Sequence, residues 1–136
     1  MITPVPPARH LLRAKDLIDA RYREPLDVPA LARAARLSTA HFSREFRRLF
    51  GETPHRYLQR RRVERAMFLL GQGGREVTDI CLEVGFTSLG SFSRTFRDIV
   101  GESPTEFRKR AVPVGVPTCF AMAWTRPSSF GEARPG

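Results

Sequence analysis

Two segments of the chain repeat each other at a fixed offset of 50 residues. The sequence STAHFSREFR at 38–47 aligns with SLGSFSRTFR at 88–97, and the same offset aligns GETP at 51–54 with GESP at 101–104. Matches over this length at a single offset indicate a duplicated structural unit rather than chance. The chain is therefore expected to contain two copies of one small fold.

Each copy is preceded by a short apolar pattern. Leu31 and Ala32 precede the first copy as Ile80 and Cys81 precede the second, although the second copy has one more residue before its longer helix. The order is a short helix, a tight turn and a longer helix, which is typical of a helix-turn-helix. A small residue in the short helix, Ala32 or Cys81, allows the longer helix to cross it closely.

The longer helix of each copy carries phenylalanines on one face. Phe42 and Phe46 are four residues apart, as are Phe92 and Phe96, so each pair is predicted to point inward together. Further apolar residues occupy equivalent places in the two copies: Leu37 and Phe86 in the turns, and Tyr57 and Phe107 after the longer helices. The opposite, outward face carries Thr39, Ala40, Ser43, Arg44, Arg47 and Arg48 in the first copy, and Leu89, Gly90, Ser91, Ser93, Arg94 and Arg97 in the second.

Capping residues, prolines and glycines divide the chain into about seven helices. The helices are predicted at 9–23, 28–35, 38–50, 54–70, 77–84, 88–100 and 103–110. No stretch alternates with a period of two, so the predicted fold class is all-α, with two helix-turn-helix subdomains joined by a long central helix. We expect a disordered lead at 1–8, a first unit with the linking helix at 9–70, a second unit at 71–110 and a flexible tail at 111–136.

Arginine dominates the charge of the 136-residue chain. The net charge is +9, and of the 23 basic residues all but Lys15 and Lys109 are arginines. Arginine forms bidentate contacts with phosphates and guanine edges, so this balance favours a nucleic acid as partner; the alternative is a basic surface that only aids solubility. The arginines at 60–62 wind round the linking helix, and we interpret them as a solvated face; the alternative is contact with a nucleic-acid backbone.

Several other functions are disfavoured by the sequence. The two cysteines, Cys81 and Cys119, have no neighbouring Cys or His, so no zinc site and no disulfide framework is predicted. A reducing, cytoplasmic compartment fits this pattern. No apolar run approaches the length of about 18 residues that a membrane-spanning helix needs. The sequence also contains no recognisable combination of a nucleophile, a base and an orienting group. We therefore expect no membrane span, no metal, no cofactor and no enzyme activity.

The second copy has a long and specific family resemblance. The sequence ICLEVGFTSLGSFSRTFRDIVGESPTEFR at 80–108 resembles the signature of the AraC/XylS family of bacterial transcription regulators. The resemblance extends over about 9–110 and implies the whole two-unit DNA-binding domain of that family, with recognition helices at 38–50 and 88–100. Larger members add a ligand-sensing barrel, for which this chain has no room, so we expect the stand-alone type or a DNA-binding remnant.

The resemblance also implies which side chains face the bases. These positions are Thr39, Ala40, Ser43 and Arg44 in the first copy, and Leu89, Gly90, Ser91, Ser93 and Arg94 in the second. Three further arginines, Arg47, Arg48 and Arg97, share the same helices and are candidates for phosphate contacts.

Four positions depart from the family pattern. Ala40 is smaller than usual, and neither Leu89 nor Gly90 has a side-chain donor. We therefore expect the first copy to recognise bases mainly through Arg44, and the second partly through apolar contact with thymine methyl groups. Arg36 occupies a turn position where glycine is usual, which costs free energy if the turn is left-handed.

These observations predict a bacterial, cytoplasmic, nucleoid-associated transcription regulator that binds double-stranded DNA as a monomer. RNA polymerase is a further candidate partner, with activation favoured over repression. The predicted linking helix spans roughly 25 Å, which can place two recognition helices near one duplex turn, about 34 Å, apart. Two alternatives stay open: a non-specific nucleic-acid binder, and an interaction module that docks on RNA polymerase. Competition with bulk DNA separates the first, and salt-insensitive, weak DNA binding would indicate the second.

Overall fold

The computed structural model describes residues 7–111, and these form seven α-helices and no strand. The helices are α1 (Pro7–Arg21), α2 (Val28–Ala34), α3 (Thr39–Phe50), α4 (Pro54–Gln72), α5 (Val77–Glu83), α6 (Leu89–Val100) and α7 (Pro104–Arg110). The predicted all-α fold with two helix-turn-helix units and a long connecting helix is confirmed.

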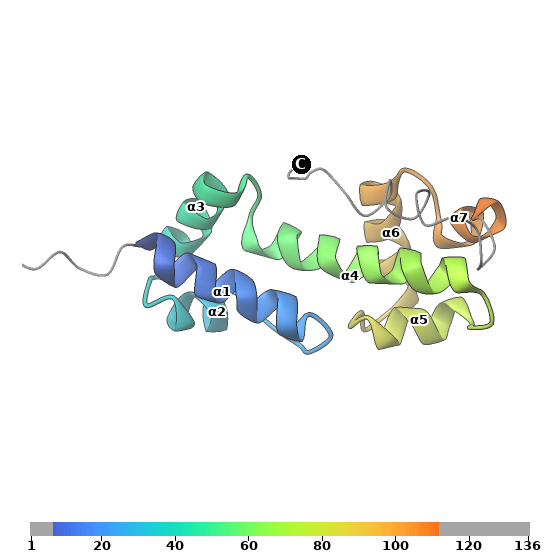
Figure 1. Ribbon diagram of the computed structural model, residues 1–136, viewed down its shortest axis with the longest axis horizontal. Helices are drawn as coiled ribbons and strands as arrows, with labels where there is room; N and C mark the ends of the chain where they lie inside the picture. Colours follow the sequence, from blue (N-terminus) through green and yellow to red (C-terminus); the bar gives the residue numbers. More distant parts are fainter. Residues whose placement is uncertain (1–6, 112–136) are drawn as a thin grey trace, which may run out of the picture.

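Helix α4 runs along the length of the molecule and connects two groups of helices (Figure 1). Helices α1, α2 and α3 pack on one another around its first half, whereas α5, α6 and α7 surround its second half. In each group the short helix, α2 or α5, lies against the longer helix, α3 or α6. The two groups are called the first unit and the second unit below.

Each unit has its own hydrophobic core. The first core consists of Leu11, Ala14, Ile18, Leu31, Ala32, Ala35, Phe42, Phe46, Tyr57 and Leu58. The second core consists of Val63, Ala66, Leu69, Leu70, Ile80, Cys81, Val84, Phe86, Phe92, Phe96 and Phe107. The four phenylalanines of α3 and α6 are 0% exposed, which confirms the predicted inward faces. Burial of such rings is the main favourable term for domains of this size.

Helix α4 belongs to both cores. Tyr57 and Leu58, near its start, pack into the first core, and Val63 begins its contribution to the second. The second half of α4 therefore supplies apolar residues to the second core, as α1 does to the first. The helix has 19 residues and extends through Gly71 to Gln72, beyond the predicted end at Leu70. It ends at Gly73, whose φ of 74° no longer follows the helix.

The first helix lies two residues earlier than predicted. It begins at Pro7, so the expected lead at 1–8 is too long: proline fits the first turn of a helix, where its missing N–H is not needed. The helix ends at Arg21, before the predicted end at Arg23, because the chain turns there and the amide of Glu24 bonds to the carbonyl of Arg21 at 2.9 Å. The residues before Pro7 and the tail after Ala111 lie outside the described part of the chain.

The arginines at 60–62 do not form a solvated face, and that interpretation is wrong. Arg60 is bound by Glu52 and Glu64, and Arg61 by Asp19 and Glu64. Arg62 is buried and bonds to backbone carbonyls. The partners of these arginines lie mostly outside their own helix, on segments that the spacing along α4 does not reveal.

Candidate nucleic-acid interface

Helix α3 is fixed at both ends by local interactions. The Ser38 side chain accepts a hydrogen bond from the amide of His41 at 3.2 Å, which satisfies an end group of the helix. Gly51 ends the helix in a left-handed conformation, with φ of 85°. Between these ends Phe42 and Phe46 anchor the inner face. The outer face is thereby held in one orientation toward solvent.

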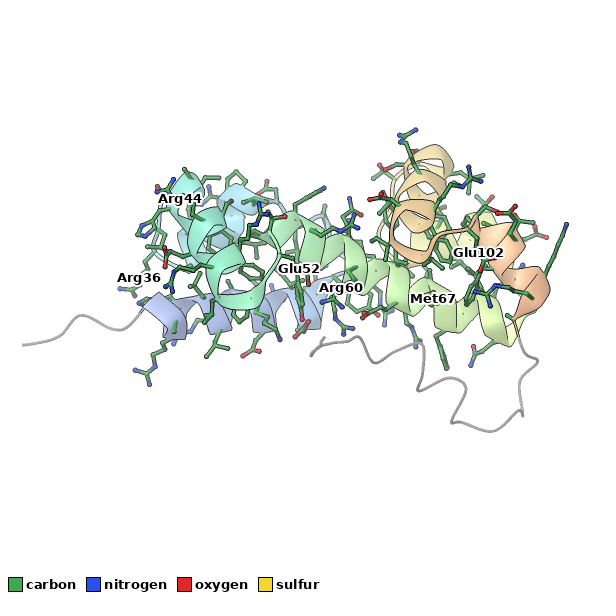
Figure 2. The ribbon with its side chains drawn as sticks, turned by 90° about the horizontal axis from the view of Figure 1, so that it is seen from above. Arg36, Arg44, Glu52, Arg60, Met67 and Glu102 are labelled. Atoms are coloured by element: carbon green, nitrogen blue, oxygen red, sulfur yellow. The ribbon has the colours of Figure 1, made fainter. Side chains whose placement is uncertain are left out.

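Helix α6 is built in the same way. Ser88 accepts a hydrogen bond from the amide of Ser91 at 3.1 Å, and Gly101 ends the helix with φ of 98°. Phe92 and Phe96 are buried against the second core. In Figure 2, α3 and α6 both lie on the upper side of α4, and Arg44 extends from α3 on that side. The duplicated sequence thus presents two similar helices on one side of the molecule.

All of the predicted site residues lie on the outer faces of these two helices. The exposed ones are Thr39, Ala40, Arg44, Arg47 and Arg48 on α3, and Leu89, Gly90, Arg94 and Arg97 on α6. Three serines are partly exposed: Ser43, Ser91 and Ser93. Leu89 is a large apolar side chain with 45% of its area in solvent.

The arginines of the two faces differ in their partners. Arg44, Arg47, Arg94 and Arg97 form no hydrogen bond or ion pair within the described residues 7–111, so their guanidinium groups are available to a ligand. Arg48 instead binds Glu45, with Nη2 and Oε1 2.6 Å apart. Its hydrogen bond lowers the pKa of the Glu45 carboxyl. Arg48 is therefore the least available of the predicted contacts.

One ion pair links α4 to the face of α6. Arg56 Nη1 lies 2.6 Å from Asp98 Oδ2, and the two side chains are 43% and 67% exposed. Asp98 also lines a shallow surface hollow together with Arg94, Thr95 and Arg97. The sequence did not identify Arg56, because its partner lies 42 residues away and no local spacing connects the two. This pair places a further guanidinium group beside the exposed arginines of α6.

The described residues contain no site for a metal and no membrane-spanning element. Nowhere in 7–111 do three His, Cys, Asp or Glu side chains gather closely enough to hold an ion. None of the helices in that range combines the length and apolarity that crossing a bilayer requires. The two units instead expose a pair of basic helices, α3 and α6, each of which is the second helix of a helix-turn-helix.

Comparison with known proteins places this architecture in a family. The family model described as a helix-turn-helix domain matches residues 31–110, more than half of the chain. A probable AraC family transcriptional regulator from Rhodopseudomonas palustris has a similar fold, with a TM-score of 0.68 at 31% identity, covering 77% of this chain and 99% of that one. The DNA-binding domain of AdpA, crystallised with a target DNA, matches with a TM-score of 0.69 at 31% identity over 74% of this chain and 90% of that one.

Curated relatives agree with this placement. An HTH-type transcriptional regulator of Haemophilus influenzae is 38% identical over 82 residues, which are 60% of this chain and 28% of that protein. The transcriptional activator RhaS of Escherichia coli is 32% identical over 92 residues, 68% of this chain and 33% of RhaS. The match thus spans about a third or less of these two relatives. The chain belongs to the AraC-type family of helix-turn-helix transcriptional regulators.

Proposed function

We propose that the chain binds double-stranded DNA sequence-specifically by inserting α3 and α6 into successive major-groove segments on one face of the duplex. The observation that carries this proposal is the pair of similar helices on one side of α4, each with exposed guanidinium groups that have no partner within 7–111. The AdpA domain, which has this fold, was solved on its target DNA. A recognition helix needs one polar face and one packed face, and both helices have this division.

The side chains divide into two roles. Arg44 and Arg94 lie near the middle of the outer faces and recognise base edges, because arginine can bond to both acceptors of guanine. Leu89 contacts the methyl group of thymine, which suits its exposed apolar side chain. Arg47 and Arg97, in the last turns of α3 and α6, contact phosphates and set the register.

The length of α4 limits how the two helices reach the duplex. Its 19 residues span about 28 Å, somewhat less than the roughly 34 Å of one duplex turn. A monomer therefore contacts two boxes about one turn apart, and bending of the DNA makes up the remaining difference. Bending of this kind costs on the order of 1–6 kcal/mol, which the additional contacts offset.

Selection of bound sites from a random DNA pool tests the proposal. The expected result is a motif of two boxes with centres about 10 base pairs apart. A pool without enrichment would instead indicate a non-specific binder, and weak binding that ignores salt would indicate an interaction module. The logarithm of affinity should fall with the logarithm of salt concentration with a slope steeper than about −4, from roughly five phosphate contacts.

Arg94→Ala separates base recognition from general charge. We expect the substitution to cost about 1–3 kcal/mol on the selected site and to relax the preference at one base position. Arg13→Ala, which removes the same charge from the exposed surface of α1, is the matched control. Fluorescence anisotropy on selected and random duplexes measures both. If Arg94→Ala lost equal affinity on both duplexes, base recognition by this residue would be refuted.

A further inference from the structure

The two cores do not merge, and one buried charge lies between them. The first core ends on α4 at Leu58 and the second begins at Val63. Arg62 lies between these positions and is 8% exposed, the only buried charged residue within 7–111. A buried guanidinium group loses its hydration, so it requires good partners in the fold.

Arg62 finds its partners on the loop between α1 and α2. Its Nε donates to the carbonyl of Tyr22 at 2.6 Å, and its Nη2 donates to the carbonyl of Glu24 at 2.8 Å. No carboxylate pairs with it among the described residues, so its hydrogen bonds go to backbone carbonyls rather than to an opposite charge. Two donors in a fixed planar arrangement hold two carbonyls in a set geometry, which a lysine could not do.

The second unit also packs against the Arg62 guanidinium group. The ring of Phe86 lies with its centroid 5.8 Å from Arg62 Cζ. A Cβ atom on Gly85 would lie 2.9 Å from Arg62 Nε, 3.0 Å from the carbonyl oxygen of Tyr22 and 3.1 Å from that of Arg23. The turn before α6 is therefore in direct contact with both Arg62 and the first unit. We call Arg62, the carbonyls of Tyr22 and Glu24, and the Gly85–Phe86 turn the Arg62 junction.

We propose that Arg62 is a positioning residue: the Arg62 junction fixes the orientation of the second unit on the first, and with it the spacing and phase of the two DNA boxes. This inference rests on the proposed two-box binding and adds the group that sets its geometry. The turn held by the junction leads directly into α6, so a shift there moves the recognition helix. The Arg56–Asp98 ion pair also joins the two units, but it lies on the surface, and surface ion pairs contribute little to stability.

Arg62→Met tests the proposal, because methionine keeps the apolar stem and removes both donors. Arg65→Met is the matched control: it lies three residues further along α4, removes the same charge, and forms no hydrogen bond or ion pair within 7–111. Affinity is measured on the selected two-box DNA, on the same DNA with one base pair inserted or deleted between the boxes, and on each box alone. For the wild type and the control we expect a sharp optimum of spacing.

For Arg62→Met we expect a flattened spacing profile, with about tenfold weaker binding at the optimum and unchanged affinity for single boxes, because only the coupling between sites is relaxed. A purely structural defect would instead weaken single-box binding as well. If Arg62→Met kept the wild-type spacing profile, the proposal would be overturned. Should Arg62→Met fail to fold, Arg62→Lys retains the charge but cannot hold both carbonyls, and the same flattening is expected.

A measurement without DNA separates this proposal from the proposed function. Spin labels at Arg33→Cys and Thr105→Cys, both exposed positions, report the distance between the units in a Cys119→Ser background, while Cys81 is buried. We expect one narrow distance distribution for the wild type and for Arg65→Met, and a broad one for Arg62→Met. Equal widths would refute the junction even if two-box binding were found, and a broadened distribution would support it even if selection returned no two-box motif.

Discussion

The two units share one plan, and they differ at the points where each contacts the rest of the molecule. The ring centroids of Phe42 and Phe46 are 5.7 Å apart, as are those of Phe92 and Phe96. A third aromatic ring follows in each unit, Tyr57 at 5.9 Å from Phe46, and Phe107 at 5.7 Å from Phe96. The interior of the helix-turn-helix was thus retained in both copies.

Two differences stand out between the copies. The hydroxyl group of Tyr57 donates to Asp19 on α1 at 2.5 Å, whereas Phe107 has no hydroxyl group to donate. The turn position before the longer helix is Arg36 in the first unit, with φ of 63°, and Gly85 in the second, with φ of 105°. Both differences arise from neighbours outside the repeated unit: α1 packs on the first unit, and Gly85, unlike Arg36, lies against Arg62 and the carbonyls of Tyr22 and Arg23.

The largest predicted effect tests whether the two cores are independent. Phe96→Ala should lower the free energy of unfolding of the second unit by about 3–5 kcal/mol, since it leaves a cavity where a fully buried ring was. Because the cores are separate clusters, hydrogen exchange should accelerate in α5–α7 while α1–α3 stay protected. Phe46→Ala should give the reverse pattern. Equal acceleration in both units would show that the molecule unfolds as one.

Gly85→Ala tests the difference at the turns. The added Cβ forces a left-handed alanine and also crowds Arg62 and two carbonyls, so we expect a loss of about 2–4 kcal/mol in the free energy of urea unfolding. Gly101→Ala is the matched control, since its φ is 98° but nothing lies within 4 Å of the added atom. It should cost about 1–2 kcal/mol, for backbone strain alone. Equal losses would mean that the groups around Gly85 move aside without a measurable cost in free energy.

Tyr57→Phe tests the difference at the third ring, and its signature is pH dependence. Burial, together with the hydrogen bond to Asp19, raises the pKa of Tyr57 above its ordinary value of 10. The folded protein then keeps this proton at pH values where the unfolded chain loses it, so the free energy of unfolding falls as pH rises above about 10. Tyr57→Phe should remove this contribution and cost about 1–2 kcal/mol at neutral pH for the lost hydrogen bond.

Urea unfolding of Tyr57→Phe between pH 8 and about 11 measures this slope. Tyr22→Phe serves as the control, because it removes a partly buried tyrosine that donates no hydrogen bond within 7–111. A slope as steep in Tyr57→Phe as in the wild type would assign the alkaline loss to other groups.

The sequence predicted what depends on neighbours along the chain and missed what depends on distant ones. The helices, their serine caps and the inward phenylalanines follow from spacings of three and four residues, and so do the outer faces of α3 and α6. In the Arg62 junction, the Arg62 side chain bonds to backbone carbonyls that lie 38 and 40 residues away along the chain. Every residue has a backbone carbonyl, so no sequence pattern reveals which ones serve as partners. Arg62 directly follows two other arginines, Arg60 and Arg61, so nothing local distinguishes the buried arginine from those in ion pairs.

Arg36→Gly has the smallest predicted effect, and its sign is informative. Arg36 is exposed and left-handed, so glycine removes strain of about 1–2 kcal/mol but loses about 0.5–1 kcal/mol through the greater freedom of the unfolded chain. We expect a net gain of about 0.5–1 kcal/mol in thermal unfolding, whereas Arg33→Gly, inside α2, should cost about 1 kcal/mol. A loss at Arg36 would mean that its side chain stabilises the turn. A gain would show that the turn tolerates a side chain at a modest cost, and that Gly85 is required by the contact between the units rather than by the turn itself.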